Sequence, residues 1–200
     1  MYVVVGQAAA LRSGAQTAAD AAALGAAEDA RDQLRDGWLD VIGDPAQWSG
    51  LLQGDGYVIE RACQRAIALA SLNKAELKSQ DCVPQDLGFT VTVQTERTVG
   101  NSIVPDTSER RATATASAVV EPLCTFEPPE PPESPSPPPS PEPPTEPDPS
   151  ATPSEEPEEE DPVPISGLSC GGEDWEINPD DPVLPPVEDL FRVRLTGDDE

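Results

Sequence analysis

The 200-residue chain carries 38 acidic and 12 basic side chains, no histidine, and a formal net charge of −26. Such a charge argues against nucleic acids and anionic lipid surfaces as partners, because both are negatively charged. Without histidine the chain lacks the commonest general base, and it contains no phosphate-binding glycine loop or zinc-protease motif. We therefore expect a protein that is not an enzyme and that binds no cofactor or metal.

The first predicted element is one long helix over Gly6 to Leu34. This stretch has no proline, and twelve of the residues from Ala8 to Ala30 are alanine, the strongest helix former. Because its apolar side chains are small, other elements can approach it closely. Gly37, preceded by Arg35, predicts the end of the helix, since a basic last turn followed by glycine is a typical C-terminal signal. Two interpretations remain for Trp38 to Ile42, one further turn or a short strand.

A second helix is predicted over Gly56 to Lys78, where apolar residues recur near helical spacing. Between the two helices lie loop residues and several large apolar side chains. We expect these side chains to cover the small-residue helix, with a binding patch as the alternative: Trp38, Ile42, Trp48, Leu51 and Leu52.

The hydrophobic period then changes to two, which is typical of strands with one buried face. Phe89, Val91 and Val93 alternate with polar residues, and a second alternating run extends from Ala112 to Val120. These runs predict an antiparallel hairpin with a long loop. The alanine face of the second strand is shallow, so we expect the helices to pack closely against it.

The segment from Glu127 to Pro164 has a different character. It contains 17 prolines and 12 acidic residues, and no basic residue. It cannot bury a core, so we predict a stiff, disordered and solvated loop. The chain divides accordingly into an α+β domain (1–126), an acidic Pro-rich linker (127–164) and a segment that returns to the same domain (165–200).

The returning segment offers two further strands. Glu173 to Ile177 predicts a short strand, and Leu190 to Leu195 a last strand with Phe191, Val193 and Leu195 facing inward. Helices that come first and strands that come later indicate an α+β fold, with the long helix and the second helix packed on a small antiparallel sheet.

Four cysteines are widely spaced and form no CxxC motif. An even number without histidine favours two disulfides in an oxidising compartment over a zinc site. Three pairings are possible. We favour Cys63 with Cys82, which ties the second helix to the next strand, and Cys124 with Cys170, which closes the base of the Pro-rich loop.

The order of residues in the first helix resembles the TadE/TadG-like family of Tad (Flp-type) pilus-assembly proteins. Members carry an AQ-x-AADAAALAAA-like stretch, which Ala15, Gln16 and the run from Ala18 to Leu24 match; Gly25 replaces an expected alanine. The resemblance covers about the first 35 residues. The Cys–Pro-rich–Cys arrangement and the ending around Leu190 to Thr196 are also similar to actinobacterial members.

The resemblance implies a pilin-like fold and a minor-pilin-like role in pilus assembly. It implies a single-pass membrane protein with an extracytoplasmic domain, whose partners are pilin-like subunits or the Tad platform. The family carries about 20 apolar residues ahead of the motif, so we expect Met1 to lie inside a membrane helix whose first half is missing. The expected helix-packing surface comprises Ala15, Gln16, Ala18, Ala19, Asp20, Ala22, Leu24 and Ala26.

A different interpretation of the same chain is a soluble, secreted binding module. In that case the Pro-rich segment recruits a partner by polyproline recognition, and no membrane helix is needed.

Overall fold

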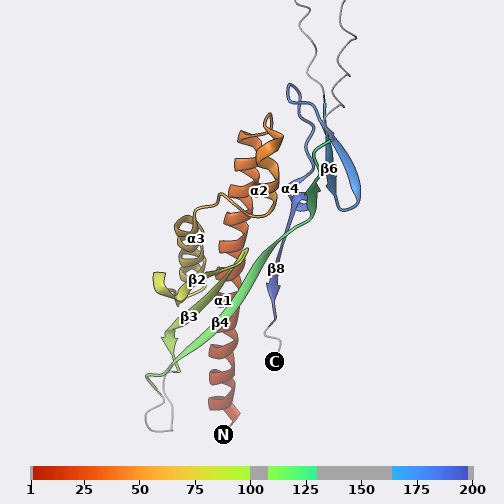
Figure 1. Ribbon diagram of the computed structural model, residues 1–200. Helices are drawn as coiled ribbons and strands as arrows, with labels where there is room; N and C mark the ends of the chain where they lie inside the picture. Colours follow the sequence, from red (N-terminus) through yellow and green to blue (C-terminus); the bar gives the residue numbers. More distant parts are fainter. Residues whose placement is uncertain (1, 100–107, 130–163, 198–200) are drawn as a thin grey trace, which may run out of the picture.

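A single long helix, α1 (Tyr2–Asp40), runs the length of the computed structural model, and the other elements pack along it (Figure 1). The structure describes residues 2–99, 108–129 and 164–197. The predicted α+β class is confirmed: helices cover one face of an antiparallel sheet. Most of the predicted disordered loop, residues 130–163, lies outside the described residues.

Helix α1 does not end at Gly37 as predicted but continues to Asp40. The reason is tertiary packing. Trp38 is buried and meets Trp48 edge to face, with ring centroids 5.4 Å apart. The gain from burying this large ring exceeds the cost of one helical glycine, about 1 kcal/mol. Trp48 opens the short helix α2 (Trp48–Leu52), which follows the 3₁₀ turn η1 (Pro45–Gln47).

The large apolar residues between the first two long helices are in the core or against it, as expected. Trp38, Trp48 and Leu52 are buried, while Ile42 and Leu51 pack against the core from its margin.

The second long helix, α3 (Ile59–Leu72), is shorter than the predicted range of 56–78. Lys74 adopts a left-handed conformation (φ 61°), and the chain then forms strand β1 (Ala75–Glu76). The expected last helical turns are a strand because Ala75 and Leu77 are buried at the sheet edge, where Ala75 pairs with Thr95. The 3₁₀ turn η2 (Ser79–Asp81) leads into β2 (Cys82–Gln85).

The predicted hairpin is present as β3 (Gly88–Thr98) and β4 (Arg111–Pro122), both longer than the alternating runs themselves. Its connection, 100–107, lies outside the described residues. In the main sheet β1 and β2 pair with one side of β3, and β4 and β8 (Phe191–Thr196) follow on the other side. All pairings among these described strands are antiparallel.

The two faces of the main sheet differ in chemistry. Toward α1 it presents the apolar side chains of β3 and β4: Phe89, Val91, Val93, Ala116, Ala118 and Val120. The opposite face carries hydroxyl pairs across the two strands, Thr90 with Ser117 (2.7 Å) and Thr92 with Thr115 (2.9 Å). The shallow alanine face of β4 lies against α1, as predicted, because two small-residue surfaces can approach closely.

A second, three-stranded sheet was not predicted. It begins with β5 (Cys124–Phe126), which pairs with β6 (Ile165–Cys170); β6 pairs in turn with β7 (Glu173–Ile177). Only β7 matches a predicted strand. The sheet lies at the end of α1 opposite its N-terminus (Figure 1).

The last strand also departs from prediction. Leu190 ends the helical turn α4 (Val187–Leu190), and β8 begins at Phe191. Phe191 is buried and Val193 half-buried, but Leu195, expected to face inward, is 38% exposed. Because β8 is an edge strand, its far end is only partly covered. The pairing of β8 with β4 brings residues 191–196 back onto the first part of the chain.

Candidate interaction surface

The surface predicted for helix packing divides into a buried and an exposed part. Its five alanines are fully buried inside this chain, under its own sheet and α3: Ala15, Ala18, Ala19, Ala22 and Ala26. Their packing is therefore intramolecular. This part of α1 has no free small-residue face to offer another helix.

The remaining predicted residues lie at the margin of this contact. Gln16 is exposed, Asp20 and Leu24 are half-buried, and the Gln16 amide donates a hydrogen bond to the Asp20 carboxylate (Nε2–Oδ1 2.8 Å). The Gln and Asp of the family-like motif thus pair with each other along the helix. Gly25, the departure from the motif, is buried, and a methyl group there would clash with Leu69 of α3. The missing side chain lets α3 approach α1 closely.

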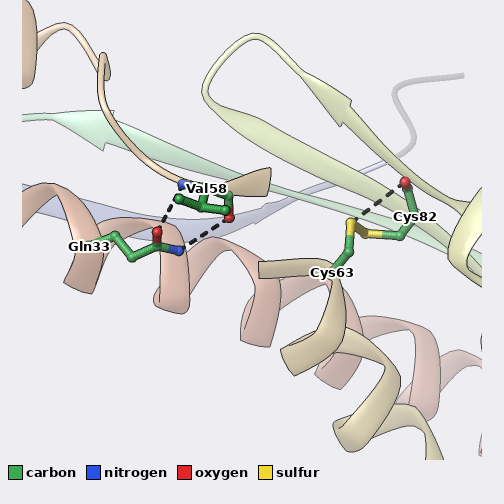
Figure 2. Close-up of a disulfide and its surroundings, with 4 residues drawn as sticks. All are labelled: Gln33, Val58, Cys63 and Cys82. Atoms are coloured by element: carbon green, nitrogen blue, oxygen red, sulfur yellow. Dashed lines mark hydrogen bonds between the residues drawn. A yellow bond between two sulfur atoms is a disulfide. The ribbon is translucent and has the colours of Figure 1, made fainter. Parts of the chain in front are cut away.

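The half-buried amide of Gln33 holds the beginning of α3 against α1. The main-chain N–H of Val58 donates to Gln33 Oε1 (2.8 Å), while Gln33 Nε2 donates to the Val58 carbonyl (3.4 Å). One turn into α3, Cys63 forms a disulfide with Cys82, the first residue of β2 (Figure 2). Helix α3 is therefore fixed to the long helix at one point and to the sheet at another.

The second disulfide joins Cys124 to Cys170, which are opposite each other in β5 and β6. Both favoured pairings are confirmed. Phe126 of β5 packs on Trp48 with ring centroids 4.9 Å apart, which fixes the second sheet to the aromatic residues at the C-terminal end of α1. The two strands that lead into residues 130–163 are thus held side by side.

The surface of α1 that remains available is its N-terminal part. Gly6, Ala8 to Ala10 and Arg12 to Gly14 are exposed, and Leu11 is half-buried. On the N-terminal side of Ala15 the sheet and α3 no longer pack closely on the helix, and these turns extend past the core (Figure 1). In the described parts of the chain, no helix is both long and apolar enough to cross a bilayer.

Between these turns and the sheet lies a groove of about 520 Å³, here called the N-terminal groove. Its lining includes Ala10, Leu11 and Gly14 of α1, Lys74 after α3, and Arg97 and Val99 at the end of β3. The sequence analysis did not identify this groove, since its walls come from three segments far apart in the chain.

The described residues hold no cluster of three or more His, Cys, Asp or Glu side chains arranged for a metal ion. Among the residues that the structure describes, two side chains have shifted pKa values. Burial raises the pKa of Tyr57, and the hydrogen bond from Arg194 lowers that of Glu121. Both residues act within the fold: the Tyr57 hydroxyl donates to the Asp86 carbonyl (3.4 Å), and Arg194 joins β8 to β4.

Comparison of the chain with protein-family models, with characterised proteins and with solved structures finds no match.

Proposed function

We propose that this chain is a non-enzymatic, envelope-anchored, minor-pilin-like protein of a Tad (Flp-type) pilus-assembly system. The observation that carries the proposal is the division of α1 into two parts. From Ala15 onward the helix is sealed against an antiparallel sheet, whereas its N-terminal turns project with small side chains exposed. A helix that is buried on its own sheet in one part and exposed in its N-terminal turns suits a subunit whose exposed turns pack against the helices of other subunits.

Two further features support the proposal. The ordered residues from Ala15 to Leu24 resemble the family motif. Two disulfides are suited to an oxidising compartment, since thiols are kept reduced in the cytosol. The extracytoplasmic position and the attachment to the membrane through the N-terminal part of α1 belong to this proposal.

The structure changes one detail of the predicted interface. Because the motif alanines pack inside the chain, contacts with pilin-like subunits or the assembly platform fall on residues 6–14 and not on Ala15 to Ala26. Small exposed residues there allow close helix approach, as in other small-residue interfaces.

Site-specific photo-crosslinking in native cells tests this assignment. A photoreactive residue replaces Ala9 on the projecting turns or, as the matched control, Glu28, which is exposed on the sealed half of the same helix. We expect adducts with pilin-like or platform proteins from position 9 and few from position 28. Equal labelling from both positions, or none from position 9, would contradict the proposed interface.

A further inference from the structure

We propose that the N-terminal groove binds the phosphate headgroups of an anionic phospholipid surface. The inference rests on the proposed function, because it assigns the membrane side of the molecule to the end where α1 projects. It concerns a property that the net charge of −26 disfavours for the chain as a whole, so it depends on how that charge is distributed.

The groove combines two cationic side chains with an apolar wall. Lys74 and Arg97 are exposed in its lining, and none of the described residues that line it is a carboxylate. Neither makes an ion pair with any residue that the structure describes. Of the acidic residues nearby in the sequence, Glu76 pairs with Arg111 at 3.8 Å, and Glu96 is exposed on the strand position next to Arg97. Glu96 also lies opposite Lys74, because its main-chain N–H donates to the Lys74 carbonyl (2.9 Å). Neither cation forms an ion pair with a described residue, so both can contact an anion.

The position of Arg97 follows from the strand itself. Along β3 the residues facing α1 are Phe89, Val91, Val93 and Thr95, and Arg97 is the next position of the same series. The register shifts between Gln94 and Thr98, where the Thr95 hydroxyl donates to the Arg97 carbonyl (2.8 Å) and accepts from Ala112 N–H (3.0 Å). The inner face of the strand thus changes from apolar side chains to the Thr95 hydroxyl, and Arg97, within the register shift that follows, is exposed and lines the groove.

Lys74 occupies a conformation that a lysine disfavours. It follows Asn73, the residue that caps α3, and its φ of 61° lies in the left-handed region where glycine is usual after a helix. Strained residues of this kind are found preferentially at functional sites. Glycine there would relieve the strain but would remove a cation from the groove.

Apolar and cationic groups are arranged as an amphipathic ligand requires. Leu11 and Val99 supply apolar contacts beside the two cations, and the exposed turns of α1 continue from the same wall. A lipid surface presents phosphate next to hydrocarbon, which matches this order, whereas a free phosphate would leave the apolar wall unused.

The acidic far end of the molecule does not prevent this binding. Asp40, at the other end of α1, is 29 residues from Leu11, which corresponds to about 40 Å along a helix. Charges in water are screened over about 8 Å at physiological ionic strength. Acidic side chains at that end are therefore largely screened from the groove, and the charges close to the groove dominate its interaction with a surface.

Vesicle co-sedimentation of the full 200-residue chain tests the proposal. We expect binding to phosphatidylglycerol vesicles and not to phosphatidylcholine vesicles. Replacing both cations (Lys74→Gln with Arg97→Gln) should weaken binding about thirtyfold. The control Arg65→Gln with Arg192→Gln makes the same change of charge on two exposed residues outside the groove lining, and should retain binding. Arg97→Lys, which keeps the charge, should also retain it.

Lys74→Gly separates binding from stability. It should weaken vesicle binding while leaving the melting temperature unchanged or higher, because glycine accepts the left-handed conformation. Failure of the wild type to bind phosphatidylglycerol vesicles, or equal losses in the groove and control pairs, would overturn the proposal. So would self-association that disappears with the groove pair in the absence of vesicle binding, since it assigns the groove to a second copy.

The outcome is distinguishable from failure of the proposed function. A protein that is found in native membranes but does not bind vesicles overturns the groove alone. A protein that binds vesicles but yields no crosslinked pilus partner from position 9 overturns the assembly role alone.

Discussion

Two hydrogen-bonding side chains, Gln33 and Arg194, join elements of this fold that main-chain hydrogen bonds alone hold weakly or not at all. Gln33 pairs with the main chain of Val58 before α3 begins, and Arg194 pairs with Glu121 to hold the edge strand β8. Neither pair was visible in the sequence, because 24 residues separate the first two partners and 72 separate the second two. Each is a polar contact between elements that pack through small or partly exposed side chains.

Replacement of Gln33 by alanine should lower the free energy of unfolding by about 1 kcal/mol, because it removes two hydrogen bonds to the start of α3. Urea denaturation measures the change. Gln16→Ala is the matched control on the same helix: Gln16 bonds only to Asp20, one turn away, so the change should stay below about 0.5 kcal/mol. Equal effects of the two substitutions would show that the contact with Val58 contributes nothing.

The Glu121–Arg194 pair should make stability depend on pH. The hydrogen bond from Arg194 lowers the pKa of Glu121 below its ordinary value of 4.5. Its contribution is therefore present above about pH 4.5 and is lost as the pH falls through the lowered pKa. Glu121→Gln should lower the melting temperature at pH 7 and have a smaller effect at pH 3. An equal effect at both pH values would contradict this assignment.

At the scale of elements, periodicity identified the parts with long regular patterns. The alanine-rich helix, the two alternating runs of β3 and β4, and the short run of β7 were all predicted. The strands β1, β5 and β6 were not, since each has two to six residues and is defined by a partner far away in the chain. The helix end predicted at Gly37 was too early, because the burial of Trp38 outweighs the low helix propensity of the glycine.

The interaction surface was likewise not predictable from local sequence patterns, because it depends on contacts between distant segments. The family-like motif predicted a surface for packing with other helices, and it gave no sign that its alanines pack against the chain's own sheet and α3. The N-terminal groove has no linear motif at all, because Leu11, Lys74 and Arg97 meet only after β3 has been placed beside α1. Alternation along β3 was only a partial signal, since it runs from Phe89 to Thr95 on one face and the register shifts before Thr98.

The two disulfides carry much of the stability expected of these elements. They close separations of 19 and 46 residues. In the chain-entropy model, loops of these lengths correspond to about 3 and 4 kcal/mol. Urea denaturation of two double variants, Cys63→Ala with Cys82→Ala and Cys124→Ala with Cys170→Ala, measures these contributions. Each double variant should have a free energy of unfolding lower by the corresponding amount, and the loss should be larger for the second. A chain as stable after reduction as before would contradict this.

On the scale of the whole molecule, α1 relates two different ends. At one end its small residues are free beside a groove with two cations; at the other, aromatic residues hold the second sheet and the bases of the Pro-rich segment. The core between them is built on alanine, whose methyl groups contribute about 0.8 kcal/mol each when buried. Close helix–sheet packing, the hydrogen bonds of Gln33 with Val58 and of Arg194 with Glu121, and two disulfides compensate for this modest burial.

Fractionation of native cells tests the central claim, that the projecting end of α1 attaches the protein to the cell envelope. Membranes and sheared pili are separated from the medium, washed with high salt and carbonate, and probed for the protein. We predict that it remains in the membrane or pilus fraction and is released by detergent. Recovery of the protein free in the medium would contradict the account and would favour the soluble, secreted binding module.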